Sequence, residues 1–281
     1  MQIRRFLLEN EKGQRFRLDN LNEGCFLISP SDLGYSYNIN FTQVGFDFIE
    51  NNKRIAQKNP KGIAYFKSYD KVKEFIDYIE SSNKLKWIYI IPFKDGEKTY
   101  YLDVSLKKFD KTEKSGKWLA CPVEFVRKSL WYEAKEVVYT IDSVTNELRW
   151  DFQWNPIFTA YDNRNIIFEN KGHTEAPFKL ELNGEVISPI ITILEDDVEV
   201  KKLDLTGLTI ATGETFIYNT KDTEQEIVKI GSGGTTNLFD FLNPNFINFF
   251  KLRKGSSKIR LEAENEIKSG KLTIYMQYKA V

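Results

Sequence analysis

The sequence has 281 residues, which is long for one compact core and suits two domains of roughly 100 to 200 residues each. Lysine and arginine together number 40, as do aspartate and glutamate, and no long block of one sign occurs, so neither nucleic acid nor a membrane is an expected partner. With no signal-peptide core and no run of about 20 apolar residues, we expect a chain that is made in the cytosol and stays soluble.

The two cysteines and the one histidine limit the chemistry that the chain can carry. Cys25 and Cys121 each stand among apolar residues, which favours buried, reduced thiols over a disulfide. A Cys–His or Ser–His–Asp site would have to use His173, which lies in a turn-like stretch and is expected to be exposed in a loop. We therefore expect no enzyme: no catalytic residue, no metal site and no cofactor.

The first half of the chain reads as strands with one helix. The expected strands cover residues 3–8, 14–18, 25–28, 85–93, 99–106 and 118–126. Glu11-Lys12-Gly13 and Asp95-Gly96 indicate hairpin turns. Ser68 can cap a helix over residues 69–82. The apolar residues of that helix recur at i, i+3, i+4 and i+7 and are expected to face the core: Val72, Phe75, Ile76 and Ile79.

Residues 34–66 form a long extended segment between these elements. Tyr35, Tyr37, Ile39 and Phe41 occupy alternate positions, as in a strand, and the polar, basic stretch at residues 51–54 interrupts the pattern. The segment is typical of a long protruding hairpin.

The second half has no convincing amphipathic helix. Its expected strands cover residues 137–141, 166–168, 178–182, 187–194, 198–203, 209–218, 225–230, 258–263 and 272–278. Short strands separated by Asn-Gly and glycine-rich turns predict a β-sandwich or jelly roll. The character of the sequence changes after Tyr132, at Glu133-Ala134-Lys135-Glu136. We therefore expect one domain at residues 1–132 and another at 133–281.

Two patterns in the second half permit functional alternatives. Glu195, Asp197 and Glu199 would share one face of a continuous strand, a spacing that resembles the catalytic strand of jelly-roll glycosidases. We favour a polar turn, because a continuous strand would bury Asp196 as an unpaired charge. The second pattern puts three rings on one face of an extended segment, which suits an inter-domain or inter-subunit contact or a saccharide platform: Trp150, Phe152 and Trp154.

Several motifs resemble, in the same order, those of the distal tail protein family of siphovirus-like phages and prophages. They are RRFLLENEKGQRFRL at residues 4–18, SDLGY at 31–35, GKWLACPVEF at 116–125 and SLWY at 129–132, with a looser match at NKGHTEAPF, residues 170–178. The resemblance implies a mainly β fold, with a β-sandwich-like, ring-forming first domain that carries one α-helix and a long extended hairpin. It implies a galectin-like or jelly-roll β-sandwich as the second domain.

The resemblance also implies a structural function as a baseplate hub. In that family the first domain builds a hexameric ring that continues the tail tube and carries the adsorption machinery. The expected partners are further copies of the chain in a homo-hexamer, the tail tube protein, the tail-tip hub protein and a receptor-binding protein. Nucleic acid and a membrane are not expected partners. The expected location is the virion tail tip, after synthesis in the host bacterial cytoplasm.

The interface residues expected from the resemblance lie in the extended segment. Phe41, Phe46 and Phe48 are the candidate anchors between subunits, with Lys53 and Arg54 at the polar tip of the hairpin. A long hairpin with partly apolar faces aggregates unless a neighbour covers it, and a closed head-to-tail ring provides that neighbour. The alternatives that stay open are a carbohydrate-binding sandwich that uses the Trp150 to Trp154 face, and a jelly-roll glycosidase.

Overall fold

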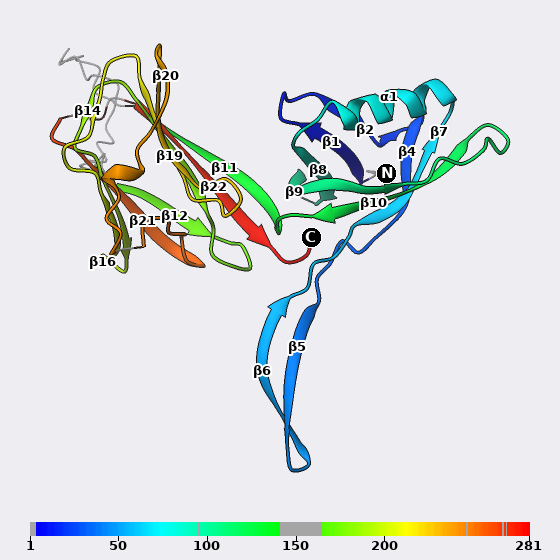
Figure 1. Ribbon diagram of the computed structural model, residues 1–281, viewed down its shortest axis with the longest axis horizontal. Helices are drawn as coiled ribbons and strands as arrows, with labels where there is room; N and C mark the ends of the chain where they lie inside the picture. Colours follow the sequence, from blue (N-terminus) through cyan, green and yellow to red (C-terminus); the bar gives the residue numbers. More distant parts are fainter. Residues whose placement is uncertain (1–3, 95, 141–164, 246, 266, 268) are drawn as a thin grey trace, which may run out of the picture. The chain divides into compact units, whose positions relative to one another are not determined.

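The computed structural model describes residues 4–94, 96–140, 165–245, 247–265, 267 and 269–281, and within them the fold is mainly β with one α-helix, as predicted (Figure 1). No helix in these ranges combines the length and the apolar character needed to cross a membrane. The chain forms two compact units: Met1–Glu133 with Gln277–Val281, and Ala134–Met276. The assignment of these units to a ring-forming domain and a galectin-like sandwich stays a prediction.

The first unit is built on one antiparallel sheet with the order β2-β1-β8-β9-β10-β7-β4-β3. The strands are β1 (Arg5–Asn10), β2 (Arg15–Arg17), β3 (Asp19–Asn20), β4 (Cys25–Ser31), β7 (Lys61–Phe66), β8 (Leu85–Phe93), β9 (Gly96–Phe109) and β10 (Leu119–Arg127). The hairpins predicted for β1–β2 and β8–β9 are confirmed by their registers. Large apolar residues fill the core below this sheet, among them Trp87, Phe66, Phe75 and Phe125.

The helix α1 (Tyr69–Glu80) begins where it was predicted to begin, because the Oγ of Ser68 accepts a hydrogen bond from the backbone N–H of Lys71 at 3.2 Å. Phe75 is buried among aromatic rings of the core. The prediction that Ile76 faces the core is wrong. Ile76 is 39% exposed, because it lies at the margin of the apolar stripe and not at its centre.

The cysteines and the histidine lie as predicted. Cys25 and Cys121 are free thiols and fully buried in the first unit. Burial raises the pKa of Cys25 from 9.0 to about 12, so its thiol stays protonated at neutral pH and is a poor nucleophile. His173 is exposed in a loop of the second unit.

The second unit contains two larger sheets. One has the order β20-β19-β18-β13-β22, from β13 (Phe178–Asn183), β18 (Thr215–Asn219), β19 (Glu226–Gly231), β20 (Gly234–Asn237) and β22 (Ser269–Tyr278). The other has the order β12-β21-β15-β16, from β12 (Asn165–Asn170), β15 (Ile190–Glu195), β16 (Val198–Asp204) and β21 (Gly255–Glu262). In β12, β13 and β21, buried positions alternate with more accessible ones, which is the pattern of a strand with one face in a core. In β15 and β18, four consecutive residues are buried, so both faces of these strands are covered.

Three shorter elements complete this unit: the paired β14 (Val186–Ile187) and β17 (Thr209–Ile210), and the 3-10 turn η1 (Phe239–Phe241). Two predicted strands are therefore divided. Residues 187–194 break where Ser188 takes a positive φ of 52°, and residues 209–218 break at Gly213, with a φ of +85°. The predicted strand at residues 137–141 is the far end of β11 (Trp131–Thr140), which runs from the first unit into the second.

Candidate assembly hairpin

The long hairpin of the first unit is β5 (Tyr37–Val44) paired with β6 (Asp47–Ile55), as the two-stranded ribbon in Figure 1 shows. Its turn is at Gly45 and Phe46, where Gly45 takes a φ of +66° that side-chain-bearing residues rarely adopt. The prediction of Lys53 and Arg54 at the tip is wrong. They pair with Ile39 and Asn38 and lie at the base, because the reversal uses the glycine and not the polar stretch.

The two faces of the hairpin differ in polarity. Cross-strand partners share a face, so the register places one set of large apolar side chains together: Tyr37, Ile39, Phe41, Phe48 and Ile55. The opposite face carries mostly polar residues, among them Asn38, Asn40, Thr42 and Arg54. The register shifts between Asn40 and Phe41, and the large apolar residues lie on the same face before and after this irregularity.

The candidate anchors are exposed to an unusual degree. Phe41 is 55% exposed, Phe48 is 67% exposed, and Phe46 at the tip is 99% exposed. Within the described residues, β5 and β6 pair only with each other, so the outer edge of each strand has free backbone groups. A two-stranded ribbon is at best marginally stable alone, and an exposed apolar edge invites pairing with another chain. The hairpin therefore presents an exposed apolar face and two unpaired edges within the described residues.

The segment that enters the hairpin, between β4 and β5, is fixed at the hairpin base by two buried side chains. The Nε1 of Trp131 donates a hydrogen bond to the carbonyl of Leu33 at 2.8 Å, and the Nη1 of Arg127 donates to the carbonyl of Gly34 at 3.0 Å. Arg127 also donates from Nε to the carbonyl of Ser129 at 2.7 Å. It is 5% exposed, and this burial lowers the pKa of the guanidinium.

The segment that leaves the hairpin, between β6 and β7, is fixed to the same end of β10. The Nε2 of Gln57 donates to the carbonyl of Arg127 at 2.8 Å, and the N–H of Phe125 donates to the carbonyl of Pro60 at 2.8 Å. The Nδ2 of Asn59 adds a bond to Glu124 at 2.9 Å. We call Arg127, Trp131 and Gln57 the base clamp. Sequence reasoning missed Arg127 and Gln57, and it marked Trp131 only as part of the family motif.

Lys53 has a structural partner at the base that explains its position. Its Nζ lies 4.6 Å from the centroid of the Tyr37 ring, on the aromatic face. Lys279 approaches the same ring, and its Nζ donates to the hydroxyl of Tyr37 at 2.8 Å. This hydrogen bond raises the pKa of Lys279. Two ammonium groups thus orient Tyr37 where the aromatic face begins.

The other candidates from the sequence do not form a site. Trp150, Phe152 and Trp154 lie outside the described residues. The predicted turn at residues 195–199 is confirmed: Glu195 ends β15, Asp196 and Asp197 take positive φ values of 52° and 63°, and β16 begins at Val198. These carboxylates are therefore not carried on one continuous strand.

Each of these carboxylates also has a cationic neighbour. Arg253 lies 3.3 Å from Glu195 and 3.0 Å from Asp196, and Arg260 lies 3.5 Å from Glu199. A hydrogen bond from Lys258 lowers the pKa of Asp197. These ion pairs are typical of a charged surface turn, in which each carboxylate lies beside a cation. In the same described part of the chain, no group of three or more His, Cys, Asp or Glu residues could hold a metal ion.

Comparison with known proteins agrees with these features. Residues 5–128 match the family model described as the distal tail protein, N-terminal domain. No curated protein sequence matches. A chain in the structure of the phage P2 baseplate, activated with Ca, is 15% identical, with a TM-score of 0.70 and 100% of each chain covered. The SPP1 Dit protein, described as a paradigm of the hub adsorption apparatus in phages that infect Gram-positive hosts, is 10% identical, with a TM-score of 0.59 and 96% and 98% of the chains covered.

The TM-scores of these solved structures show a common fold, and the family model matches most of the first unit. The matched region contains the whole hairpin and Arg127 of the base clamp. Residues 5–128 therefore match the N-terminal domain of the distal tail protein, and the chain as a whole has the fold seen in the phage P2 baseplate chain and in the SPP1 Dit protein.

Proposed function

We propose that the chain forms a homo-hexameric ring at the tip of a siphovirus-like tail, and that the β5–β6 hairpin is the contact between neighbouring subunits. The observation that carries this proposal is a 67% to 99% exposure of Phe48 and Phe46 on a ribbon whose edges are both unpaired in the described part of the chain. A second subunit that covers the aromatic face removes this exposed apolar surface from water. Each phenylalanine buried in this way contributes about 1.5–3 kcal/mol.

The hairpin suits a head-to-tail interface. In a head-to-tail contact, the hairpin of one subunit would cover a different surface on the next subunit. Such heterologous contacts form a ring when the rotation between subunits closes. The base clamp supports this role, because a hairpin that is fixed at its base presents Phe41 and Phe48 at a defined orientation.

The proposed partners follow from the family and the solved structures. The ring would contact the tail tube protein on one side and the tail-tip hub protein on the other, and it would carry a receptor-binding protein. The similar solved structures support these partners, because one is a phage baseplate and the other is a protein of a hub adsorption apparatus. The chain would be made in the host bacterial cytoplasm and would act by shape, without chemistry of its own.

Native mass spectrometry at tens of micromolar, with negative-stain imaging of the same sample, tests the ring. We expect six-subunit rings with an open centre. The double variant Phe41→Thr/Phe48→Thr keeps strand-compatible residues but removes both rings, and we expect it to remain monomeric with an unchanged far-UV spectrum. Phe93→Thr is the matched control, because Phe93 is a 45% exposed phenylalanine on a strand of the same unit. It should assemble like the wild type.

Two results would contradict the proposal. Hexamers of the double variant would show that the hairpin is not the subunit contact. A wild-type chain that stays monomeric, both alone and on purified tail tubes of its own phage, would show that the chain is not a ring subunit.

A further inference from the structure

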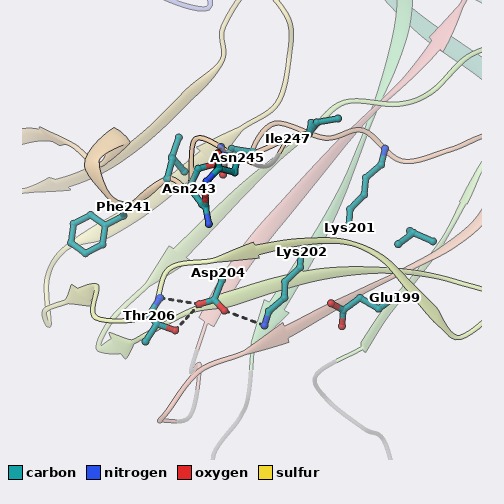
Figure 2. Close-up of a pocket in the computed structure, with 12 residues that line it drawn as sticks. Glu199, Lys201, Lys202, Asp204, Thr206, Phe241, Asn243, Asn245 and Ile247 are labelled. Atoms are coloured by element: carbon teal, nitrogen blue, oxygen red, sulfur yellow. Dashed lines mark hydrogen bonds and ion pairs between the residues drawn. The ribbon is translucent and has the colours of Figure 1, made fainter.

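We propose that a groove in the second unit binds an uncharged saccharide. The groove lies between the edge strand β16 and the loop that follows η1, as Figure 2 shows, and its volume is about 1040 Å³. That volume is at the upper end of the range for small-molecule sites and gives room for an oligosaccharide. The inference does not depend on the ring, because every lining residue belongs to the second unit.

One wall of the groove presents the side-chain amides of Asn243, Asn245 and Asn248, which follow η1 in the chain. The Oδ1 of Asn243 accepts the backbone N–H of Asn245 at 3.0 Å, and the Nδ2 of Asn248 donates to the carbonyl of Asn243 at 2.8 Å. These bonds hold the loop. Within the described residues, the side chain of Asn245 makes no hydrogen bond, and it is labelled in the groove in Figure 2. An amide has both donors and an acceptor, as a pair of sugar hydroxyls requires.

The opposite wall presents a carboxylate that is fixed and ionised. Lys202 lies 3.1 Å from the Oδ2 of Asp204, and Thr206 donates to its Oδ1 from the hydroxyl at 2.5 Å and from the N–H at 3.1 Å. The hydroxyl bond from Thr206 is the main cause that lowers the pKa of Asp204. The carboxylate and the ammonium are thus preorganised acceptor and donor groups, which lowers the ordering cost of binding.

Charge and apolar surface narrow the class of ligand. The charged lining residues are two acids, Glu199 and Asp204, and two lysines, Lys201 and Lys202, so the groove has no net charge and gives no preference for a phosphate or a polyanion. Phe241 lines the groove and is 40% exposed, so its ring can contact the apolar C–H face of a sugar. Amides, a fixed carboxylate and an exposed ring together suit a neutral saccharide.

The test is binding of the purified full chain to an array of neutral oligosaccharides, followed by calorimetric titration of the strongest member. We expect at least one ligand whose affinity is unchanged when salt is raised, because no ion pair is formed. Asn245→Ala should lower that affinity about tenfold, the effect of one or two lost hydrogen bonds, and Phe241→Leu should lower it by a similar factor. Both exchanges are at exposed positions, so the melting temperature should not change.

Asn83→Ala is the control, because Asn83 is an exposed asparagine in the first unit. It should bind like the wild type. Three outcomes would overturn the proposal. The first is no binding anywhere on the array, and the second is equal binding by Asn245→Ala and the wild type. The third is that the wild type binds an extended peptide in place of a saccharide and that Asn245→Ala loses this peptide binding. Hexamer formation by Asn245→Ala is measured separately, so failure here leaves the ring proposal intact.

Discussion

The guanidinium of Arg127 donates a hydrogen bond to the backbone carbonyl of Gly34, 93 residues earlier in the chain. The contact joins the last residue of β10 to the segment that enters the hairpin. The donor is buried, and its described partners are backbone carbonyls rather than a carboxylate. Burial of a cation is costly unless it is hydrogen-bonded, and these carbonyls supply the hydrogen bonds. Removal of the arginine side chain would leave the carbonyls without their donor, so it should change both the stability and the order of the segment that Arg127 holds.

We predict that Arg127→Met loosens the hairpin. Methionine keeps the buried volume but leaves the carbonyls of Gly34 and Ser129 without their donor, and the free energy of unfolding should fall by about 2 kcal/mol. Hydrogen exchange should quicken over residues 37–55 more than in the rest of the first unit. Arg54→Met is the control, since Arg54 is exposed on the hairpin itself, and it should leave the exchange pattern unchanged. Equal protection in the wild type and Arg127→Met would show that the clamp has no such role.

Trp131→Phe should produce a smaller change of the same kind. The indole N–H donates to Leu33, whereas phenylalanine keeps most of the buried ring and loses this bond. We expect a loss of about 1 kcal/mol in urea unfolding, partly from the hydrogen bond and partly from the smaller ring. Combined with Arg127→Met, the two losses should not add, because both side chains hold adjacent residues of one segment. Strict additivity would contradict a joint clamp.

The turn of the hairpin gives a third prediction. Gly45 has a φ of +66°, so Gly45→Val should cost about 1–2 kcal/mol of hairpin stability, whereas Gly45→Asn should be tolerated. Because no atom lies within 4 Å of a side chain added there, the difference between the two variants isolates the backbone strain from any steric clash. Nuclear magnetic resonance shifts of residues 42–49 measure it. Two variants with the same shifts would place the turn elsewhere.

The elements that the sequence predicted well are those whose signals are local. Asp95-Gly96 marks a tight turn wherever it stands between two strands, and Ser68 with its apolar stripe marks a helix start. The tip of the long hairpin was misplaced because both faces of that ribbon are exposed. Without a buried face, the alternation of apolar and polar residues does not distinguish a turn from a strand. The tip was therefore predicted at the polar stretch that contains Lys53, whereas the chain reverses at Gly45.

The base clamp was beyond sequence reasoning for another reason. Gly34 and Arg127 are distant in sequence, and a lone arginine in a strand gives no sign that it will be buried. The groove in the second unit joins β16 with a loop some 40 residues later, and its asparagines alone resemble any turn. In contrast, the turn at residues 195–199 could be predicted, because burial of Asp196 was unfavourable on any continuous strand.

That turn provides a fourth prediction. Asp197 takes a positive φ of 63°, so Asp197→Gly should be neutral or raise the melting temperature, while Asp197→Val should lower it. Neither variant should affect assembly, because the turn is in the second unit and its carboxylates pair with cations there. Thermal unfolding and native mass spectrometry measure the two effects. Defective assembly by a folded Asp197→Gly protein would refute the view that this acidic stretch is only a turn.

The last prediction concerns alkaline pH. Burial raises the pKa of Cys25 to about 12, whereas the thiol of the unfolded chain ionises near 9.0. Between these values the unfolded chain has lost the proton and the folded chain has kept it, so stability is complete below about pH 9 and falls as the pH rises further. Burial also raises the pKa of Tyr218, which steepens the fall. Urea unfolding should therefore show a loss of up to about 1.4 kcal/mol per pH unit from Cys25 above about pH 9, and a further loss of similar size from Tyr218 above about pH 10. Cys25→Ala should be less stable than the wild type at neutral pH, because it leaves a small cavity, but its stability should fall less steeply with pH. Equal slopes in the two proteins would show that Cys25 is not buried as the structure has it.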